Sequence, residues 1–278
     1  MRLYFFSFHF AAFLLMFGCT THDKEIIMVS GSTTVLSVVS KAAELYRLNH
    51  PNVMIIVNAG GSGVGVNQTG EKTVNIGMIS RDITDAERNK FSQINFVTHL
   101  IGKDAVAVAL SSEVYDSGIK TLTFQQIKAI YKGEINNWKE IGNFDKDILV
   151  IDKEQSSGTR HVFMKAVFGN KTAEAPGADL VLGSNNEEQT ALIQSNSAIG
   201  MLSLAWLNDN VKGAGIQISN EVVEPSKENI VNGKYPISRS LLLITDGKPT
   251  GAVKKFIDFI KGGKGQEIVE ESGYVRIN

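Results

Sequence analysis

The 278-residue sequence has little cysteine, little histidine and almost no net charge. One cysteine cannot form a disulfide within the chain, and with only five histidines a cysteine-based zinc site is nearly excluded. The formal net charge is -1, from 28 Lys and Arg against 29 Asp and Glu, so the chain lacks the overall positive charge that is typical of nucleic-acid-binding proteins. We therefore predict no metal, no cofactor and no nucleic-acid partner.

Internal repeats and low-complexity linkers are also missing from the sequence. The composition, with 43% hydrophobic and 21% charged residues, is that of an ordinary folded protein. A chain of this length can bury one large core or two modest ones, and the usual domain size of roughly 100–200 residues favours two.

The N-terminus carries an apolar run over residues 3–17, after a basic residue and before a Gly-Cys pair. This order is typical of a signal peptide, and the run is short for a transmembrane helix. The end of the run resembles a bacterial lipobox, in which Cys19 becomes the lipidated first residue of the mature chain. Phe17 stands where that motif usually has a small residue.

We expect a lipoprotein signal peptide over residues 1–18 and a tether over residues 19–25. The mature protein would lie outside the cytoplasm, in the periplasm or cell envelope, anchored to a membrane by lipid on Cys19. Several acyl chains on one cysteine hold a protein at a membrane durably. The alternatives are an uncleaved anchor helix and a buried segment with a free thiol.

Strand and helix signals alternate along the rest of the chain. Short apolar runs predict strands at residues 26–29, 53–57, 74–79, 104–110, 149–151 and 241–245. Helical spacing begins at residue 35 and recurs over residues 123–132, 160–168, 189–196 and 251–261. This alternation predicts an α/β fold of two lobes, each a mostly parallel sheet flanked by helices, with ligands at the carboxyl ends of the strands. We expect lobe 1 over residues 26–106 and 213–278, and lobe 2 over residues 107–212.

Four polar loops share Ser, Thr and Gly near the start of a helix. The candidate anion-binding residues in these loops are Ser32, Thr33, Thr34, Ser62, Ser80, Ser157, Gly158 and Thr159. A helix start leaves backbone N–H groups without partners and carries partial positive charge, so it suits an anion, and hydroxyls add donors. Each loop alone is explained by helix capping. Four loops at one edge favour an anion site instead.

Charged residues near these loops are the candidate ionic groups. The guanidinium of Arg81 matches two oxygens of an oxyanion, unless it forms a surface salt bridge with Asp82 or Asp85. Asp82 could accept a hydrogen bond from a protonated ligand oxygen, which would favour phosphate over sulfate, or it is a solvated carboxylate. Lys153 and Arg160 could add positive charge from lobe 2; the alternative for either residue is simple exposure at the surface.

Residues 60–65 are rich in glycine and raise the possibility of a nucleotide site. Their spacing is not the full dinucleotide-binding fingerprint, and no Gly-Lys-Ser or Gly-Lys-Thr follows as in a P-loop. The loop is better suited to a small anion.

Several segments together resemble the PstS family, the substrate-binding proteins of phosphate-specific ABC transporters. The segments that carry the resemblance are residues 30–35, 60–63, 76–81, 122–124, 133–138, 157–160 and 198–200. They cover nearly all of the expected mature chain in matching order. The resemblance implies a type II periplasmic-binding-protein fold, a phosphate buried between the lobes, and a membrane permease as partner.

The resemblance also assigns roles to residues. Hydrogen-bond donors would be Thr33, Thr34, Ser62, Ser157, Gly158 and Thr159, with Arg81 near the ligand. The sequence departs from the family at Lys153, where many members have Arg, and at Gln155, where some have Asp. Both departures alter the charge balance of the expected site.

The leading hypothesis is a monomeric binding protein whose lobes close on phosphate. Sulfate or molybdate remain alternative ligands, because hydroxyls and helix starts suit any tetrahedral oxyanion. A phosphate-sensing or adhesive surface lipoprotein is a further alternative. An enzyme on the same fold is not favoured, because no Ser-His-Asp set, Cys-His set or metal-ligand cluster is readable. His50, His99 and His161 are isolated in sequence and suit surface or cap roles.

Overall fold

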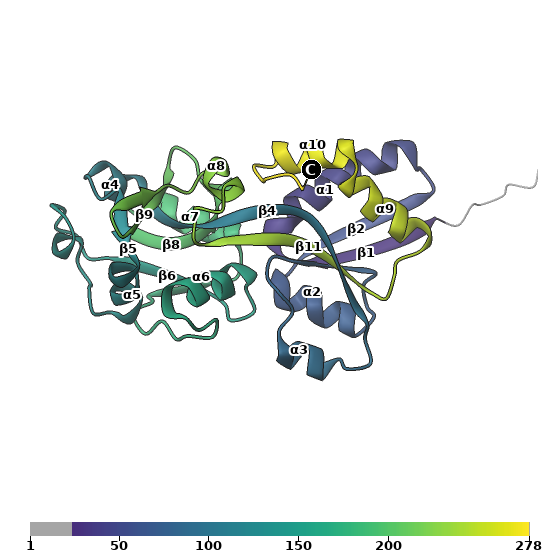
Figure 1. Ribbon diagram of the computed structural model, residues 1–278, viewed down its shortest axis with the longest axis horizontal. Helices are drawn as coiled ribbons and strands as arrows, with labels where there is room; N and C mark the ends of the chain where they lie inside the picture. Colours follow the sequence, from purple (N-terminus) through teal and green to yellow (C-terminus); the bar gives the residue numbers. More distant parts are fainter. Residues whose placement is uncertain (1–23, 278) are drawn as a thin grey trace, which may run out of the picture.

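The structure, a computed structural model, describes residues 24–277 as two lobes joined by two long strands (Figure 1). The signal peptide expected over residues 1–18, the lipidation site Cys19 and most of the expected tether lie outside the described residues. Within residues 24–277, no helix combines the length and the apolarity that crossing a membrane requires.

Lobe 1 is a parallel unit covered by helices on both faces. Its elements are β1 (Glu25–Gly31), α1 (Thr33–Asn49), β2 (Val53–Ala59), α2 (Gly61–Gly70), β3 (Ile76–Ile79), α3 (Asp85–Lys90), α9 (Gly251–Lys261) and α10 (Gly263–Glu271). Strand β1 pairs in parallel with β2 and with β3. Helices α1, α9 and α10 bury apolar faces such as Val35, Phe256 and Ile268 against one side of these strands, and α2 buries Val66 against the other.

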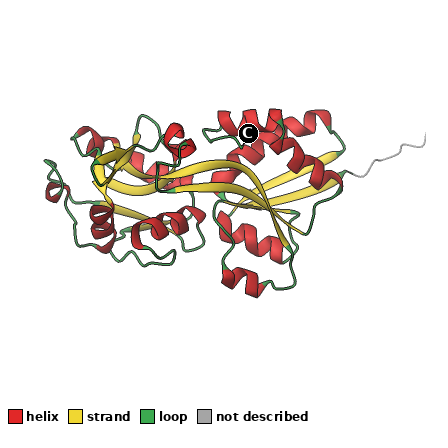
Figure 2. Ribbon diagram, in the orientation of Figure 1, coloured by secondary structure: helices red, strands yellow, loops and turns green. Residues whose placement is uncertain are grey.

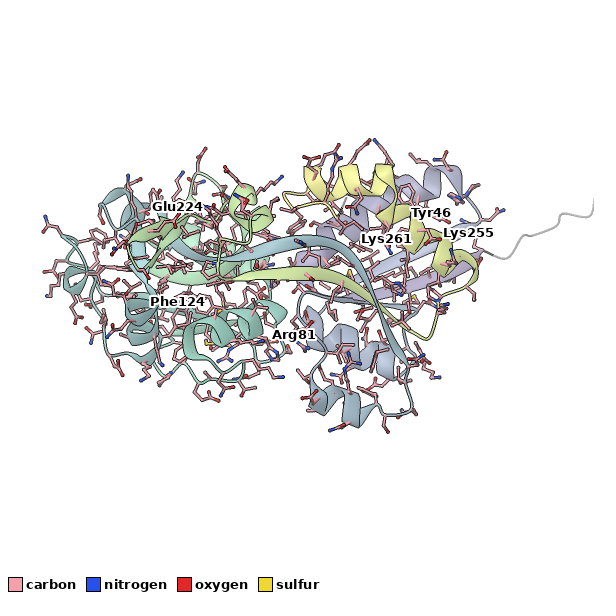
Figure 3. All side chains as sticks on the ribbon, in the orientation of Figure 1. Tyr46, Arg81, Phe124, Glu224, Lys255 and Lys261 are labelled. Atoms are coloured by element: carbon pink, nitrogen blue, oxygen red, sulfur yellow. The ribbon has the colours of Figure 1, made fainter. Side chains whose placement is uncertain are left out.

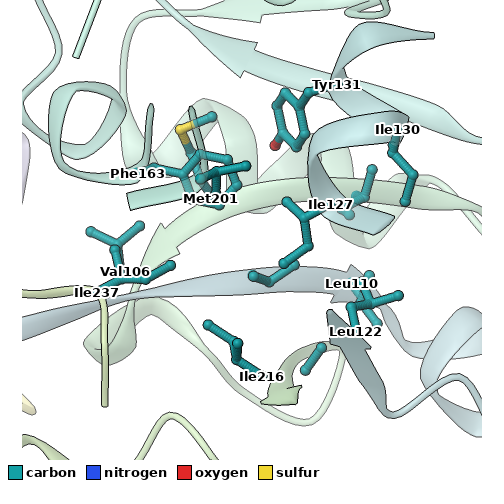
Figure 4. Packing of buried hydrophobic residues seen from close by; sticks show 14 of the residues in the cluster. Val106, Leu110, Leu122, Ile127, Ile130, Tyr131, Phe163, Met201, Ile216 and Ile237 are labelled. Carbon is teal, nitrogen blue, oxygen red and sulfur yellow. The ribbon is translucent and has the colours of Figure 1, made fainter. Parts of the chain in front are cut away.

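Lobe 2 repeats the alternation of strands and helices around a larger core. Its elements are α4 (Ser112–Asp116), β5 (Thr121–Thr123), α5 (Phe124–Lys132), β6 (Leu149–Lys153), α6 (Gly158–Phe168), β7 (Leu180–Leu182), α7 (Asn185–Gln194), β8 (Ala198–Ser203), β9 (Val211–Ile218), β10 (Glu221–Val223), α8 (Lys227–Val231) and short 3-10 turns at Trp138–Glu140 and Leu204–Trp206. Thr123 and Gly133 start and stop α5 as expected, the first by a capping box and the second in the left-handed conformation. Figure 4 shows Tyr131, Phe163 and Met201 packed together in this core.

Two antiparallel strands connect the lobes. They are β4 (Phe96–Ser111) and β11 (Ser238–Asp246), and both run through the middle of the molecule from one lobe to the other (Figure 2). β4 pairs with β11 and, further along, with β8 and β9, while β11 also pairs with β3. The strand order β2-β1-β3-β11-β4-β8-β6-β7 therefore runs continuously from one lobe to the other.

The two-lobed α/β fold predicted from the sequence is confirmed, and the parallel pairs lie within the lobes. The return to lobe 1, however, comes later than residue 213. Ala214 and Tyr235 belong to the core of lobe 2, and β11 carries the chain back from Ser238. The boundary expected at residue 213 does not match this packing, because the apolar side chains within residues 211–237 pack and pair in lobe 2.

Candidate functional site

Five buried hydroxyl groups meet where the two lobes face each other. We call them the hydroxyl cluster: Ser32, Thr34, Ser62, Ser80 and Thr159. Ser32 and Thr34 lie at the start of α1, Ser62 in the first turn of α2, Ser80 directly after β3, and Thr159 in the first turn of α6. All five came from the polar loops that the sequence analysis singled out.

The loops converge because the parallel strands β1 and β3 end at one edge of lobe 1, and α6 of lobe 2 begins opposite that edge. Ser32 Oγ donates a hydrogen bond to Ser80 Oγ at 3.0 Å. The backbone N–H of Ser80 donates to Ser62 Oγ, also at 3.0 Å. These bonds fix three hydroxyls side by side in a region closed to solvent.

Helix starts in the cluster differ in how they are capped. Ser32 and Gly60, the N-cap residues of α1 and α2, make no side-chain capping bond within residues 24–277, and neither helix has an acidic residue in its first turn. At α6, by contrast, the hydroxyl of Ser157 caps the helix by accepting from the backbone of Arg160. The capping explanation thus fits Ser157, whereas the starts of α1 and α2 remain electropositive toward the cluster.

Arg239, which the sequence analysis did not select, supplies the cation of the cluster. Its guanidinium comes from β11 and is only 7% exposed. Nη1 donates to Thr159 Oγ1 at 2.9 Å and to Ser80 Oγ at 3.3 Å, and Nη2 donates to Thr34 Oγ1 at 3.1 Å. One side chain therefore contacts hydroxyls from both lobes.

Asp104 on β4 is the counter-charge of Arg239. Its Oδ2 accepts from Nε and Nη2 of Arg239 at 2.9 and 2.7 Å, and the two residues are register partners in the β4–β11 ladder. Burial raises the pKa of Asp104, an effect that the adjacent Arg239 charge opposes. The second oxygen, Oδ1, is buried and has no hydrogen-bond partner within residues 24–277. The Ser203 hydroxyl and the Ala105 backbone lie close to this carboxyl and also lower its pKa, so Asp104 is a buried carboxylate with polar neighbours besides Arg239.

Direct contacts also join the two lobes around the cluster. Asn185, at the start of α7, donates from Nδ2 to Thr34 Oγ1 at 3.0 Å, and its Oδ1 has no partner among the described residues. The backbone N–H of Gly63 donates to the carbonyl of Ser156 at 3.0 Å. The lobes are therefore apposed in this structure, with donors from four helix starts facing one small region.

Arg81, the expected ionic donor, lies outside the hydroxyl cluster. It is buried on lobe 1 where that lobe faces lobe 2 (Figure 3), and its guanidinium binds both carboxylate oxygens of Glu87 at 2.7 and 2.9 Å. The partner is neither Asp82 nor Asp85. Asp82 is exposed, and its backbone carbonyl accepts from Arg81 at 2.9 Å.

The Arg81–Glu87 pair predicts a pH dependence of stability. Burial alone would raise the pKa of Glu87, but hydrogen bonds from Arg81 and Thr84 lower it below its ordinary 4.5. A lowered folded-state pKa gives stability that is present above the unfolded pKa and lost as the pH falls through the folded value. Glu87→Gln should therefore cost about 1–2 kcal/mol of unfolding free energy at pH 7. In urea titrations the gap from wild type should narrow as the pH falls below 4.5, and a gap independent of pH would contradict this explanation.

Lys153 and Arg160 lie inside lobe 2 and are not surface residues. Lys153 Nζ contacts Glu188 at 2.5 Å and donates to the carbonyl of Ser184 at 3.0 Å. Arg160 binds both oxygens of Asp152 through Nε, each at 3.0 Å. Both cations are neutralised by buried carboxylates next to the starts of α6 and α7. Their side chains therefore support these helices and do not contact the hydroxyl cluster.

The remaining expected site residues occupy the edge of the cluster. Gly158 contacts it through its backbone, since a Cβ there would lie 2.3 Å from Ser62 Oγ and 2.6 Å from Ser80 Oγ. Thr33, the first residue of α1, is half-buried, and no side-chain hydrogen bond of Thr33 is found within residues 24–277. The arrangement as a whole offers hydroxyls, backbone N–H groups, one paired guanidinium and one buried carboxylate. That combination can bind a small oxyanion. Within residues 24–277, no group of three or more His, Cys, Asp or Glu residues could hold a metal ion.

Comparisons with known proteins agree with this chemistry. The model of the PBP superfamily domain matches residues 19–262. The phosphate-binding protein PstS of Bacillus subtilis (strain 168) is 33% identical over 253 residues, covering 90% of this chain and 80% of that protein. PstS of Borreliella burgdorferi is 31% identical over 273 residues, covering 95% of this chain and 94% of that protein.

Solved structures give the same result. A phosphate ABC transporter substrate-binding protein from Clostridium perfringens, with bound phosphate, has a TM-score of 0.82 and 31% identity, covering 91% of this chain and 100% of that chain. An ABC-type phosphate transport receptor from Vibrio cholerae has a TM-score of 0.71 and 30% identity, covering 90% and 99%. The family resemblance seen in the sequence and the type II binding-protein fold are thereby confirmed. This chain belongs to the PBP superfamily and, within it, to the family of PstS phosphate-binding proteins.

Proposed function

We propose that this protein binds one inorganic phosphate between its lobes and delivers it to the permease of an ABC importer. The observation that carries the proposal is the hydroxyl cluster, in which donors from both lobes surround the Arg239 guanidinium. A ligand held by both lobes stabilises the closed state over the open one, and closure is what a permease can recognise. Binding and release need no catalytic group.

The phosphate ligands that we propose are Ser32, Thr34, Ser62, Ser80, Gly158, Thr159 and Arg239. This set keeps most of the residues expected from the sequence and takes Arg239 in place of Arg81 as the ionic donor. Thr33 would contribute through its backbone N–H at the start of α1. Ser157 would contribute by capping α6, since its own N–H donates to the carbonyl of Glu154, and Lys153 and Arg160 through support of lobe 2. Residues 1–18 as signal peptide, lipidation at Cys19, a location outside the cytoplasm and a monomeric state complete the proposal.

Asp104 is the group that we propose to distinguish phosphate from sulfate. Phosphate carries a proton at neutral pH and can donate a hydrogen bond to the buried Asp104 carboxylate, whereas sulfate has no proton and would place its charge beside that carboxylate without a hydrogen bond. Asp82, the earlier candidate for this role, is exposed and turns only its backbone carbonyl to Arg81.

Calorimetry tests the function and the selectivity together. Wild-type protein should bind phosphate 1:1 and sulfate much more weakly. Asp104→Asn should reduce the phosphate-over-sulfate ratio by about tenfold, because an amide accepts a hydrogen bond less strongly than a carboxylate. Asp82→Asn, which removes the same charge from an exposed site, is the matched control and should leave the ratio unchanged. Absence of phosphate binding by wild-type protein would refute the function itself.

A further inference from the structure

A cleft of about 550 Å³ adjoins the hydroxyl cluster but extends beyond it. Arg239 is one of its lining residues, and the others come from α6 and the loop after it, from the segment after β3 and from the region around the start of β11. The hydroxyl cluster itself is closed by side chains in contact, so this cleft is an additional space between the lobes. Phosphate binding in the hydroxyl cluster assigns no role to this cleft.

The charges that line the cleft are predominantly positive. Lys165 and Lys171 are exposed, and neither forms a salt bridge within residues 24–277. Asp82 is the one carboxylate among the lining residues described. The charges of Arg81 and Arg239 are offset by Glu87 and Asp104, which leaves two lysines against Asp82 and an excess of one positive charge on this surface.

Two buried polar atoms at the same place have no partner among residues 24–277: Arg81 Nε and His161 Nδ1. His161 Nε2 lies 2.9 Å from the carbonyl oxygen of Gln155 and therefore carries the hydrogen, which leaves Nδ1 as an acceptor. Burial and the nearby charge of Arg81 lower the pKa of His161 to about 4, so the ring is neutral at pH 7. The residues that line the cleft therefore include one unpaired donor and one unpaired acceptor, the two kinds of group that a protonated oxyanion requires.

We propose that the cleft is an outer anion subsite, where Lys165, Lys171, Arg81 and His161 hold phosphate before it enters the hydroxyl cluster. The proposal rests on the proposed function and adds a binding step to it. Clefts lined by one sign of charge concentrate counter-ions and raise association rates, and the effect falls as salt screens it. The lysines lie on lobe 2 and Arg81 on lobe 1, so the subsite forms as the lobes approach each other.

Stopped-flow measurement of phosphate association tests the subsite. The double variant Lys165→Glu/Lys171→Glu should lower the association rate constant about tenfold at low ionic strength, and the deficit should shrink at high salt. The dissociation rate constant should stay unchanged, because neither lysine contacts the hydroxyl cluster. Both lysines are exposed, so the variant should fold normally.

The matched control is Lys41→Glu/Lys255→Glu, which makes the same change in net charge on exposed residues of α1 and α9, outside the lining of the cleft. A selective loss of rate in the cleft variant supports the subsite. Equal rate constants in wild type and cleft variant, or an equal loss in the control, would overturn it. Either overturning result would come with intact 1:1 binding at equilibrium, so failure of the subsite is distinct from failure of the phosphate-binding function.

Discussion

Arg239→Ala should weaken phosphate binding by about a hundredfold or more, which corresponds to about 2.7 kcal/mol. Three hydroxyls of the cluster lose their shared donor, and the ligand loses the cation that spans the two lobes. Asp104 would remain buried without its counter-charge, a situation that costs several kcal/mol or forces the carboxyl to take up a proton. Calorimetric titration with phosphate measures the loss of affinity directly.

Two further variants separate binding from folding. Arg239→Lys keeps the positive charge near Asp104 but loses the fork that reaches Thr34 and Thr159, so it should fold normally and still bind at least about tenfold more weakly. Arg81→Ala removes an equally buried guanidinium from outside the hydroxyl cluster, so it should leave the rate constant of phosphate dissociation unchanged, whereas Arg239→Ala should raise it. A folded Arg239→Ala protein with near wild-type affinity would place phosphate outside the cluster.

Hydroxyl residues of the site could be predicted from the sequence because each one follows a strand or begins a helix. Ser32, Ser62 and Ser80 belong to successive strand-loop-helix units, and parallel pairing brings the ends of those units together. Thr159 could be placed opposite them because the pattern recurs in lobe 2. Local sequence signals were sufficient to place these hydroxyls, because loops that follow parallel strands all lie at the same edge of the sheet.

Arg81 shows where local reasoning failed to position a side chain. Ser80 and Arg81 lie in the bend that follows β3, where Ser80 faces the cluster and Arg81 reaches Glu87 instead. A local signal was available in the capping box of Thr84 and Glu87, which holds the Glu87 carboxylate within reach of Arg81. Proximity in sequence to the predicted site was therefore a poor guide to contact with it.

Arg239 and Asp104 were missed because their partnership is long-range. The two residues are 135 positions apart and meet only through the antiparallel pairing of β4 with β11, which the expectation of mostly parallel sheets did not include. Each nevertheless stands at the start of an apolar run: Asp104 directly before residues 105–110, and Arg239 two positions before residues 241–244. Opposite charges on two buried strands are expected to pair, because an unpaired buried charge carries a large desolvation cost. That signal could have identified the pair.

Gly158→Ala should abolish tight phosphate binding, with an expected loss of about a hundredfold or more. An added methyl group would lie 2.3 Å from Ser62 Oγ and 2.6 Å from Ser80 Oγ, both across the interlobe boundary. These hydroxyls are held by hydrogen bonds within lobe 1, so they cannot move aside without breaking the cluster. The variant should fold as wild type, because the clash arises only when the lobes come together.

Gly263→Ala is the matched control, since a Cβ at Gly263, the first residue of α10, meets no atom within 4 Å. Its affinity for phosphate should equal that of wild type. Small-angle scattering adds a readout that affinity cannot give: phosphate should compact the wild type and Gly263→Ala, but not Gly158→Ala. Phosphate-induced compaction of Gly158→Ala with unchanged affinity would mean that α6 does not close onto Ser62 and Ser80 in the bound state. The hydroxyl cluster would then not be the place where the two lobes hold their ligand.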